Sequence, residues 1–136
     1  MLATTSATRP AMTSVSPFFI VRDLDRVLGF YRDGLGFEVA FLAPDLDPFF
    51  AIVRRDGVQL MLKVVADGVD PLPNCSRHPW ARWDAYVHVP DPDVLAAEFA
   101  SRAIAFSAPL ADTDDGLRGF EITDPNGYVL FLGRPR

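Results

Sequence analysis

The sequence contains few of the residues from which many functional sites are built. It has one cysteine, Cys75, and two histidines, His78 and His88, among 136 residues. A single cysteine excludes an intrachain disulfide framework, and a free thiol without a secretory signal favours the cytoplasm. No phosphate-binding loop, nucleophile elbow or zinc-finger spacing is present. These absences exclude several common classes of enzyme and metal-binding domain.

Basic residues are in the minority, and long apolar runs are missing. Lys and Arg number 13 against 18 Asp and Glu, which gives a formal net charge of −5. This balance argues against binding to nucleic acid or to an anionic membrane surface. No segment has the length of a transmembrane helix or a signal peptide. We therefore expect an acidic cytoplasmic protein whose first residues, 1–12, form a flexible tail.

The clearest local pattern that is present is GFEITDPNGYVLFLG, residues 119–133. Pro125 and Gly127 favour a chain reversal over residues 124–127. Apolar and polar residues alternate on both sides of it, which predicts a hairpin of two half-buried strands. A similar pattern occurs in FFAIVRRDGVQLMLK, residues 49–63, when Gly57 is aligned with Gly127 at a shift of 70 residues.

A second match supports the first. FFIVRDLDRVLGFY, residues 18–31, resembles YVHVPDPDVLAAEF, residues 86–99, at a shift of 68. Each half then reads as a strand (about 14–21 and 83–89), a helix capped by an aspartate (about 24–33 and 92–101) and three more strands. Two similar shifts in the same order predict a duplicated unit, with chance matching of alternating strands as the alternative.

Strand alternation divides the side chains into two faces. The face expected beneath the helices is mostly aliphatic and includes Phe50, Ile52, Leu60, Ile122 and Leu130. The other face is mixed. It carries Ser16, Phe18, Phe49, Ala51, Gln59, Met61, Lys63, Asp84, Tyr86, His88, Glu121, Thr123, Val129 and Phe131. If each sheet curls, this face forms a ligand cup with aromatic walls, whereas a flat sheet would leave it wetted by solvent.

The pairing of IVRDLDRVLGFYRDGLGFEV with GFEITDPNGYVLFL resembles the vicinal oxygen chelate superfamily, over about residues 14–134. That superfamily includes glyoxalase I, extradiol dioxygenases and bleomycin-resistance proteins. The resemblance implies an α+β fold of two tandem βαβββ modules that form a cup-shaped curled sheet, with the helices on the outer face. The modules would span about 13–65 and 83–134, with a linker at 66–82, within one domain of residues 13–136. A homodimer is the implied assembly.

Metal-dependent members of the superfamily place ligands on the first and last strand of each module. The corresponding positions here are Ser16, Met61, Asp84 and Phe131. Hydroxyl, thioether and phenyl groups are poor ligands for a divalent ion, and a catalytic metal normally needs about three protein ligands. Only Asp84 fits, so the resemblance implies no metal and no other cofactor.

In this respect the chain is similar to the bleomycin-resistance branch, whose members bind a drug without chemistry. The implied function is metal-independent sequestration of a flat or cationic small molecule. Asp84 and Glu121 would attract a cation, and aromatic rings would stack on the ligand. Trp80 is expected at the rim of the cleft, whereas Trp83 fits either the rim or the core. The ligand-binding residues predicted on this basis are Phe18, Phe49, Met61, Trp80, Trp83, Asp84, Tyr86, His88, Glu121 and Phe131.

Two other classes of function stay open at this point. One is a divergent metal-dependent lyase or dioxygenase with rearranged ligands such as Asp84, His88 and Glu121. The other is a structural or regulatory subunit without a ligand, for which a cup filled by its own side chains would be the sign.

Overall fold

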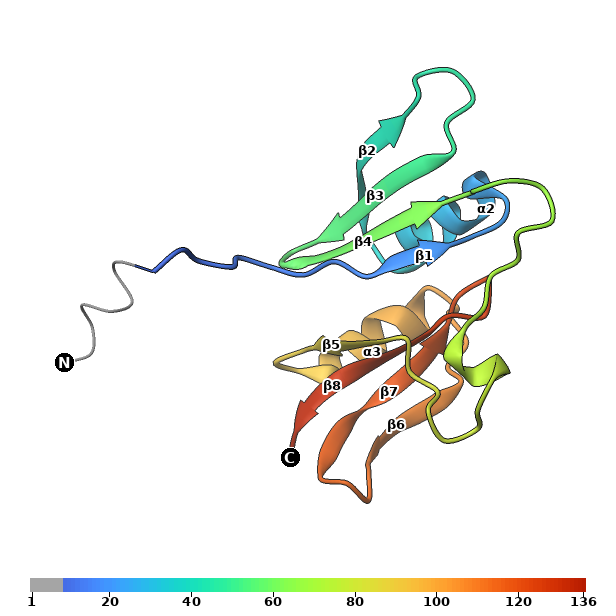
Figure 1. Ribbon diagram of the computed structural model, residues 1–136. Coiled ribbons are helices and arrows are strands. Elements are labelled where there is room, and N and C mark those ends of the chain that lie inside the picture. The colour runs from blue at the N-terminus through green and yellow to red at the C-terminus, as the bar shows by residue number, and fades with distance from the viewer. Residues whose placement is uncertain (1–8) are drawn as a thin grey trace.

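The computed structural model describes residues 9–136, and Figure 1 shows two modules of the same topology. The first contains β1 (Phe18–Ile20), α2 (Leu24–Gly29), the π-helical turn η1 (Phe30–Gly34), β2 (Glu38–Ala43), β3 (Phe50–Arg55) and β4 (Val58–Lys63). The second contains β5 (Ala85–His88), α3 (Pro92–Ser101), β6 (Ala108–Asp112), β7 (Leu117–Thr123) and β8 (Val129–Pro135). The segment that joins them contains the short 3-10 helix η2 (Asn74–Ser76).

Each module forms one four-stranded sheet, with strand orders β1-β4-β3-β2 and β5-β8-β7-β6. The first strand of each sheet runs parallel to the last, and the other neighbours are antiparallel. Helix α2 contacts β3, and α3 contacts β6, β7 and β8. The predicted α+β fold of two βαβββ modules is therefore confirmed. Most of the predicted flexible tail, residues 1–8 of 1–12, lies outside the described residues.

The helix starts follow from their capping residues. The Asp23 side chain accepts a hydrogen bond from the Arg26 amide at the start of α2, and Asp91 accepts one from the Val94 amide at the start of α3. Such caps satisfy amides that have no partner inside the helix. Helix α3 has the predicted bounds, whereas the first helix ends early and continues as the π-helical turn.

The predicted turn at residues 124–127 is also confirmed. The Gly127 amide donates a hydrogen bond to the Asp124 carbonyl at 3.0 Å, and Gly127 has φ +91°. The hairpin of the first module is tighter. Arg55 pairs with Val58, so two residues join β3 to β4, whereas Thr123 pairs with Val129 and five residues join β7 to β8.

This difference in loop length corrects one prediction. Met61 pairs with Ile52, but Phe131, its counterpart in the second module, pairs with Glu121. The true counterpart of Ile52 is therefore Glu121 and not Ile122. Because side chains alternate along a strand, a slip of one residue reverses every side chain of β3.

The predicted faces of β3 are consequently wrong. Ala51 and Val53 are fully buried in the core, while Phe50 and Ile52 lie on the opposite face with Met61. Phe49 precedes the strand and has the alternation of Ala51, so it does not belong to the face where the sequence pattern placed it.

A shared core holds the modules together. The rings of Phe19 and Tyr128 stack with centroids 4.2 Å apart, and the Tyr31 hydroxyl donates to Asp124 at 2.8 Å. Burial raises the pKa of Tyr31 well above its usual value, and burial also raises the pKa of Asp124. The Arg55 guanidinium forms a further link through its ion pair with Glu98 on α3, at 2.8 Å. The relative placement of the two sheets thus rests on several specific contacts.

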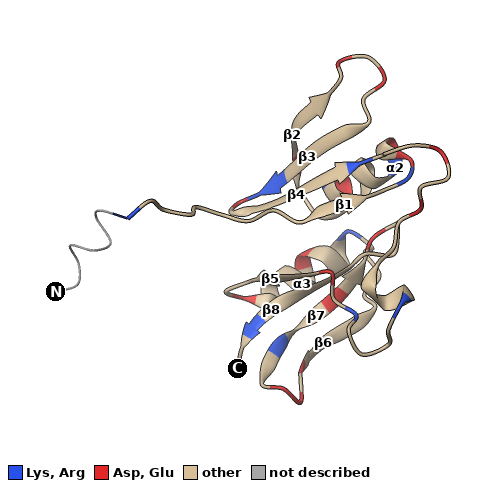
Figure 2. Cartoon of the chain, in the orientation of Figure 1, with Lys and Arg blue, Asp and Glu red and all other residues tan. Residues whose placement is uncertain are grey.

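Charged residues of both signs are distributed around the molecule. Acidic residues mark the β2–β3 loop and the β6–β7 turn, and basic residues lie at several strand ends (Figure 2). Within residues 9–136, none of the helices combines the length and apolar character that crossing a membrane requires.

Candidate ligand-binding site

The sheet of module 1 presents an apolar surface on its helix-free face, which we define by Phe18, Ile20, Phe41, Phe50, Ile52 and Met61. Strand pairing places these residues together, since Phe18 pairs with Met61 and Ile52 pairs with both Met61 and Phe41. The Phe50 ring lies 6.2 Å from Phe18 and 6.1 Å from Phe41, centroid to centroid. Phe18 and Phe41 are 52% and 51% exposed. An exposed aromatic cluster of this kind is typical of a binding surface.

The helix-free face of module 2 carries Tyr86, His88, Glu121, Val129 and Phe131, and it is filled. Phe131 is only 3% exposed, because the Trp83 ring stacks on it with centroids 4.1 Å apart and an angle of 20° between the planes. Tyr86 contacts Phe131 at 5.3 Å, and His88 contacts Tyr86 at 4.4 Å. Trp83, Phe131, Tyr86 and His88 therefore form a continuous row of rings.

Two glycines form the floor beneath Phe131. Gly119 pairs with Gly133 across β7 and β8. A Cβ atom on Gly133 would lie 2.5 Å from the Arg118 carbonyl oxygen and 2.6 Å from the Phe131 ring. The absence of side chains at this pair thus allows the Phe131 ring to lie close against the sheet.

Glu121 lies among these rings and is 8% exposed. Its carboxylate accepts hydrogen bonds from Arg82 Nη2 at 3.1 Å, Trp83 Nε1 at 2.9 Å and Ser107 Oγ at 3.4 Å. The bond to Glu121 raises the pKa of the Arg82 guanidinium. A buried carboxylate needs such partners. The acid expected to attract a ligand is thus neutralised from within the chain.

The Asp84 carboxylate, directly before β5, also accepts hydrogen bonds from within the chain. One carboxylate oxygen accepts from the Asn74 amide at 2.9 Å, and the other accepts from the Val129 amide at 2.8 Å. Asp84 therefore joins the linker to the first residue of β8. Each of its two carboxylate oxygens already accepts one hydrogen bond, so only the remaining lone pairs could bind a ligand.

The four positions that correspond to metal ligands carry no ligand set. Ser16 accepts a weak hydrogen bond from Gln59 at 3.3 Å, Met61 lies on the apolar face of module 1, and Phe131 is covered by Trp83. Within residues 9–136, no three His, Cys, Asp or Glu side chains are grouped closely enough to hold a metal ion. The donor chemistry of these positions does not fit a divalent ion.

The remaining predicted residues lie at the margins. Trp80 is 89% exposed in the linker and meets His78 edge to face, at 5.6 Å. Phe49 is 47% exposed, and the Lys63 ammonium lies 5.7 Å from its ring centroid. Sequence reasoning missed Phe41, Phe50 and Ile52 as members of the apolar face. The two-residue turn at Asp56–Gly57 was the available signal, because its length fixes the register of β3.

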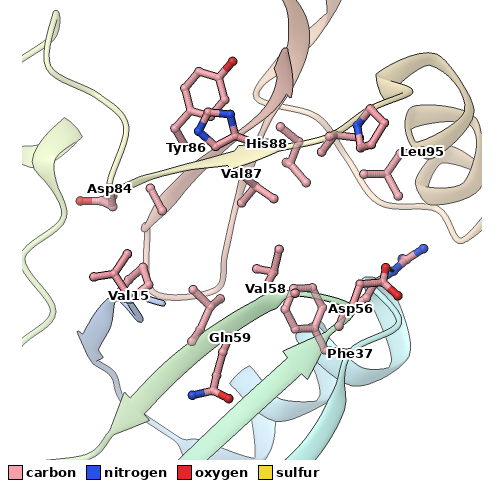
Figure 3. A pocket seen from close by; sticks show the side chains of 18 of the residues that line it. Val15, Phe37, Asp56, Val58, Gln59, Asp84, Tyr86, Val87, His88 and Leu95 are labelled. Atoms are coloured by element: carbon pink, nitrogen blue, oxygen red, sulfur yellow. Dashed lines mark ion pairs between the residues drawn. The ribbon is translucent and has the colours of Figure 1, made fainter. Parts of the chain in front are cut away.

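A separate cavity of about 820 Å³ lies between the modules (Figure 3). Its walls are mostly apolar and include Val58, Leu60, Ala85, Val87, Val89 and Leu95. In Figure 3, Val87 points from β5 into the cavity, whereas Tyr86 and His88 point to the other side of the strand. Strands β1 and β5 each lie at the end of their sheet. Module 2 contributes its edge strand β5 to the walls, whereas module 1 contributes Val15, Pro17 and the start of β4.

Comparisons with known structures agree with this architecture. A bleomycin-binding protein from Streptomyces verticillus, in complex with copper(II)-bleomycin, is 25% identical, with a TM-score of 0.67 over 94% of this chain and 100% of that one. TnmS3, an antibiotic-binding protein from Streptomyces sp. CB03234, is 21% identical, with a TM-score of 0.64 over 94% and 100%. TioX from Micromonospora sp. ML1 is 19% identical, with a TM-score of 0.68 over 91% and 100%. A comparison with curated proteins gave no significant match.

The family model that matches this chain covers residues 14–132, nearly the whole of the two modules. Together with the repeated βαβββ topology, this match shows that the chain belongs to the Glyoxalase/Bleomycin resistance protein/Dioxygenase superfamily.

Proposed function

We propose that this protein binds and sequesters a flat or cationic small molecule without a metal, as the bleomycin-resistance proteins do. The observation that carries the proposal is the exposed aromatic surface on the helix-free face of module 1. A surface with Phe18 and Phe41 half exposed beside Phe50 is costly in water unless something covers it. Bound aromatic rings would cover it by stacking.

Two further observations favour binding over catalysis. The positions that would carry metal ligands hold a hydroxyl, a thioether, a phenyl ring and one carboxylate whose oxygens are engaged. Solved structures with this fold include a bleomycin-binding protein in complex with copper(II)-bleomycin and the antibiotic-binding protein TnmS3. The helix-free face of module 2 is covered by the chain's own Trp83, as expected for a structural or regulatory subunit that binds no ligand. The exposed aromatic face of module 1 argues against that alternative.

A homodimer is part of the proposal. The apolar cavity lies between the two modules, and Val15, which lines it, is 89% exposed. A second copy placed over the cavity would cover Val15 as well, and it would bring one module of each chain together. Sedimentation velocity is the direct measurement, and a monomer at all concentrations would exclude this assembly.

Isothermal titration calorimetry tests the binding function. The probes are bleomycin, copper(II)-bleomycin and N-methylacridinium, added to protein pretreated with a chelator. We expect at least one probe to bind chelator-treated protein as well as untreated protein. The double change Phe18→Ser with Phe50→Ser should weaken that binding about tenfold or more, because two stacking surfaces are lost.

A matched control is Val94→Ser, which removes an exposed apolar side chain from helix α3, where it is 65% exposed. This change should leave binding intact. Equal affinity of the Phe18→Ser, Phe50→Ser protein and the parent would show that the aromatic face is not the site. Binding that the chelator abolishes would favour the metal-dependent alternative.

A further inference from the structure

The last residues of the linker cover the helix-free face of module 2. The Trp83 ring lies flat on Phe131 and meets Tyr86 nearly edge to face, at 5.8 Å and 79°. The Arg82 guanidinium lies beside it on Glu121. We call these two side chains, Arg82 and Trp83, the linker cover. It places a cation on the carboxylate and a flat ring on the phenyl ring.

The layers beneath the linker cover cannot move away from it. Phe131 lies against Gly119 and Gly133, where even a Cβ atom would overlap the ring. Glu121 is held in the middle of β7, paired with Phe131 of β8. The receiving surface is therefore rigid, and it consists of one aromatic ring and one carboxylate.

The main chain of the linker cover is held separately, by hydrogen bonds that do not involve the Arg82 and Trp83 side chains. Asn74 Nδ2 donates to the Trp83 carbonyl at 3.0 Å, and the Asp84 amide donates to the Val129 carbonyl at 2.8 Å. The Arg82 side chain is 40% exposed. Both side chains can leave the face by rotating about their own bonds while the main chain keeps its hydrogen bonds.

We propose that the linker cover is an internal stand-in for the ligand, which must displace it to bind. The matching ligand carries a positive charge next to a planar aromatic ring: its charge replaces Arg82 on Glu121, and its ring replaces Trp83 on Phe131. The inference rests on the proposed binding function and names the class of ligand that module 2 accepts. A neutral ring cannot replace Arg82, because it would leave Glu121 buried without a cation.

Competition by a tethered group reduces the apparent affinity to the intrinsic affinity multiplied by the fraction of protein that is open. Trp83→Ala removes the stacked ring, and we expect N-methylacridinium to bind this variant about tenfold more tightly than the parent, since an aromatic pair contributes up to about that factor. Leu72→Ala is the matched control, because it removes an exposed apolar side chain from the same linker. It should change the affinity less than about twofold.

A spectroscopic measurement follows the displacement itself. In a Trp80→Phe protein, Trp83 gives the single indole N–H signal in a ¹⁵N–¹H spectrum, and that N–H is bonded to Glu121 at 2.9 Å. N-methylacridinium at saturation should shift this signal strongly as the bond breaks. Neutral acridine, the uncharged match of the probe, should leave it in place.

The results separate this inference from the proposed function. If a probe binds the parent but the Trp83 signal stays fixed, or if Trp83→Ala binds N-methylacridinium no more tightly, the inference is overturned and the binding function stands. If no probe binds the parent or Trp83→Ala, both are overturned. Should Trp83→Ala not fold, the indole signal of the Trp80→Phe protein decides alone.

Discussion

The two modules share one topology but use the same face of the sheet in opposite ways. In module 1 the helix-free face is open, and Phe18 is 52% exposed. In module 2 the equivalent face is closed by Trp83, and Phe131 is 3% exposed. The residues Met61 and Phe131 are counterparts, since each pairs with the aromatic residue of the first strand, Phe18 or Tyr86. One duplicated unit has therefore produced an exposed aromatic surface and a buried one.

The source of the difference lies outside the repeat. The linker that follows module 1 supplies Arg82 and Trp83 to module 2, and no described segment supplies such a cover to module 1. The glycine pair beneath Phe131 has no counterpart in module 1 either, because Phe50 and Lys63 occupy the equivalent paired positions of β3 and β4. The lesson is that equal topology does not imply equal function when the residues that finish a face come from a connecting segment.

The largest expected effect tests this contrast at counterpart positions. Phe131→Ala should lower the free energy of unfolding by about 4 kcal/mol, because it removes a buried ring and leaves a cavity beneath Trp83. Met61→Ala should cost about 1 kcal/mol, since Met61 is only partly buried on an open face. Urea denaturation measures both. Similar losses would show that the two faces are equally packed.

A second comparison concerns the glycines. Gly133→Ala should lower the free energy of unfolding by about 3 kcal/mol, because the new Cβ would lie 2.5 Å from a backbone oxygen that cannot move freely. Gly57→Ala in the hairpin turn of module 1 meets no atom within 4 Å. It serves as the control and should change stability by less than about 0.5 kcal/mol. Thermal unfolding of the two variants checks this, and a stable Gly133→Ala protein would contradict the close packing of Phe131.

The smallest expected effect is a pH dependence of stability that comes from Asp124 in the β7–β8 turn. Burial raises the pKa of Asp124, so the folded state holds this proton more tightly than the unfolded state does. The resulting stability is present below the unfolded pKa of about 3.9 and is lost as pH rises through the raised folded value. As the pH falls from about 7.5 to about 4.5, the parent should therefore gain stability relative to the Asp124→Asn variant.

Denaturation at both pH values measures this change, and Asp56→Asn is the control from the turn of module 1. The Asp56 side chain is 90% exposed, so its replacement should have little effect at either pH. A difference between the parent and Asp124→Asn that stays constant with pH would contradict the role of burial at Asp124.

Local patterns made much of the fold predictable. Asp91 followed by Pro92 marked the start of α3, and the DPNG turn marked the β7–β8 hairpin, because caps and turns depend on a few neighbouring residues. The face of β3 was not predictable by aligning Gly57 with Gly127. The two loops differ by an odd number of residues, and the register, which sets the face, depends on pairing with β4.

The candidate site was predictable in part. The sequence pointed to Phe18, Met61, Tyr86 and Phe131 as residues of one kind of face, and strand pairing places them so. That Phe41 belongs to this face could not be read from alternation within a single strand, because β2 contains a register shift between Val39 and Phe41. The ion pair between Glu121 and Arg82 could not be predicted, because it depends on the path of the linker, and the linker sequence has no periodic pattern.

The sequence by itself determined the two modules, their helix starts and the lack of a metal-ligand set at the four expected positions. These features depend on residue types and on spacings within short segments. Only the tertiary structure decided which face of β3 is buried, which aromatic surface stays open and which acid is already neutralised. Those outcomes depend on strand register and on contacts between residues far apart in the chain, such as Arg82 with Glu121, and packing alone brings such residues together.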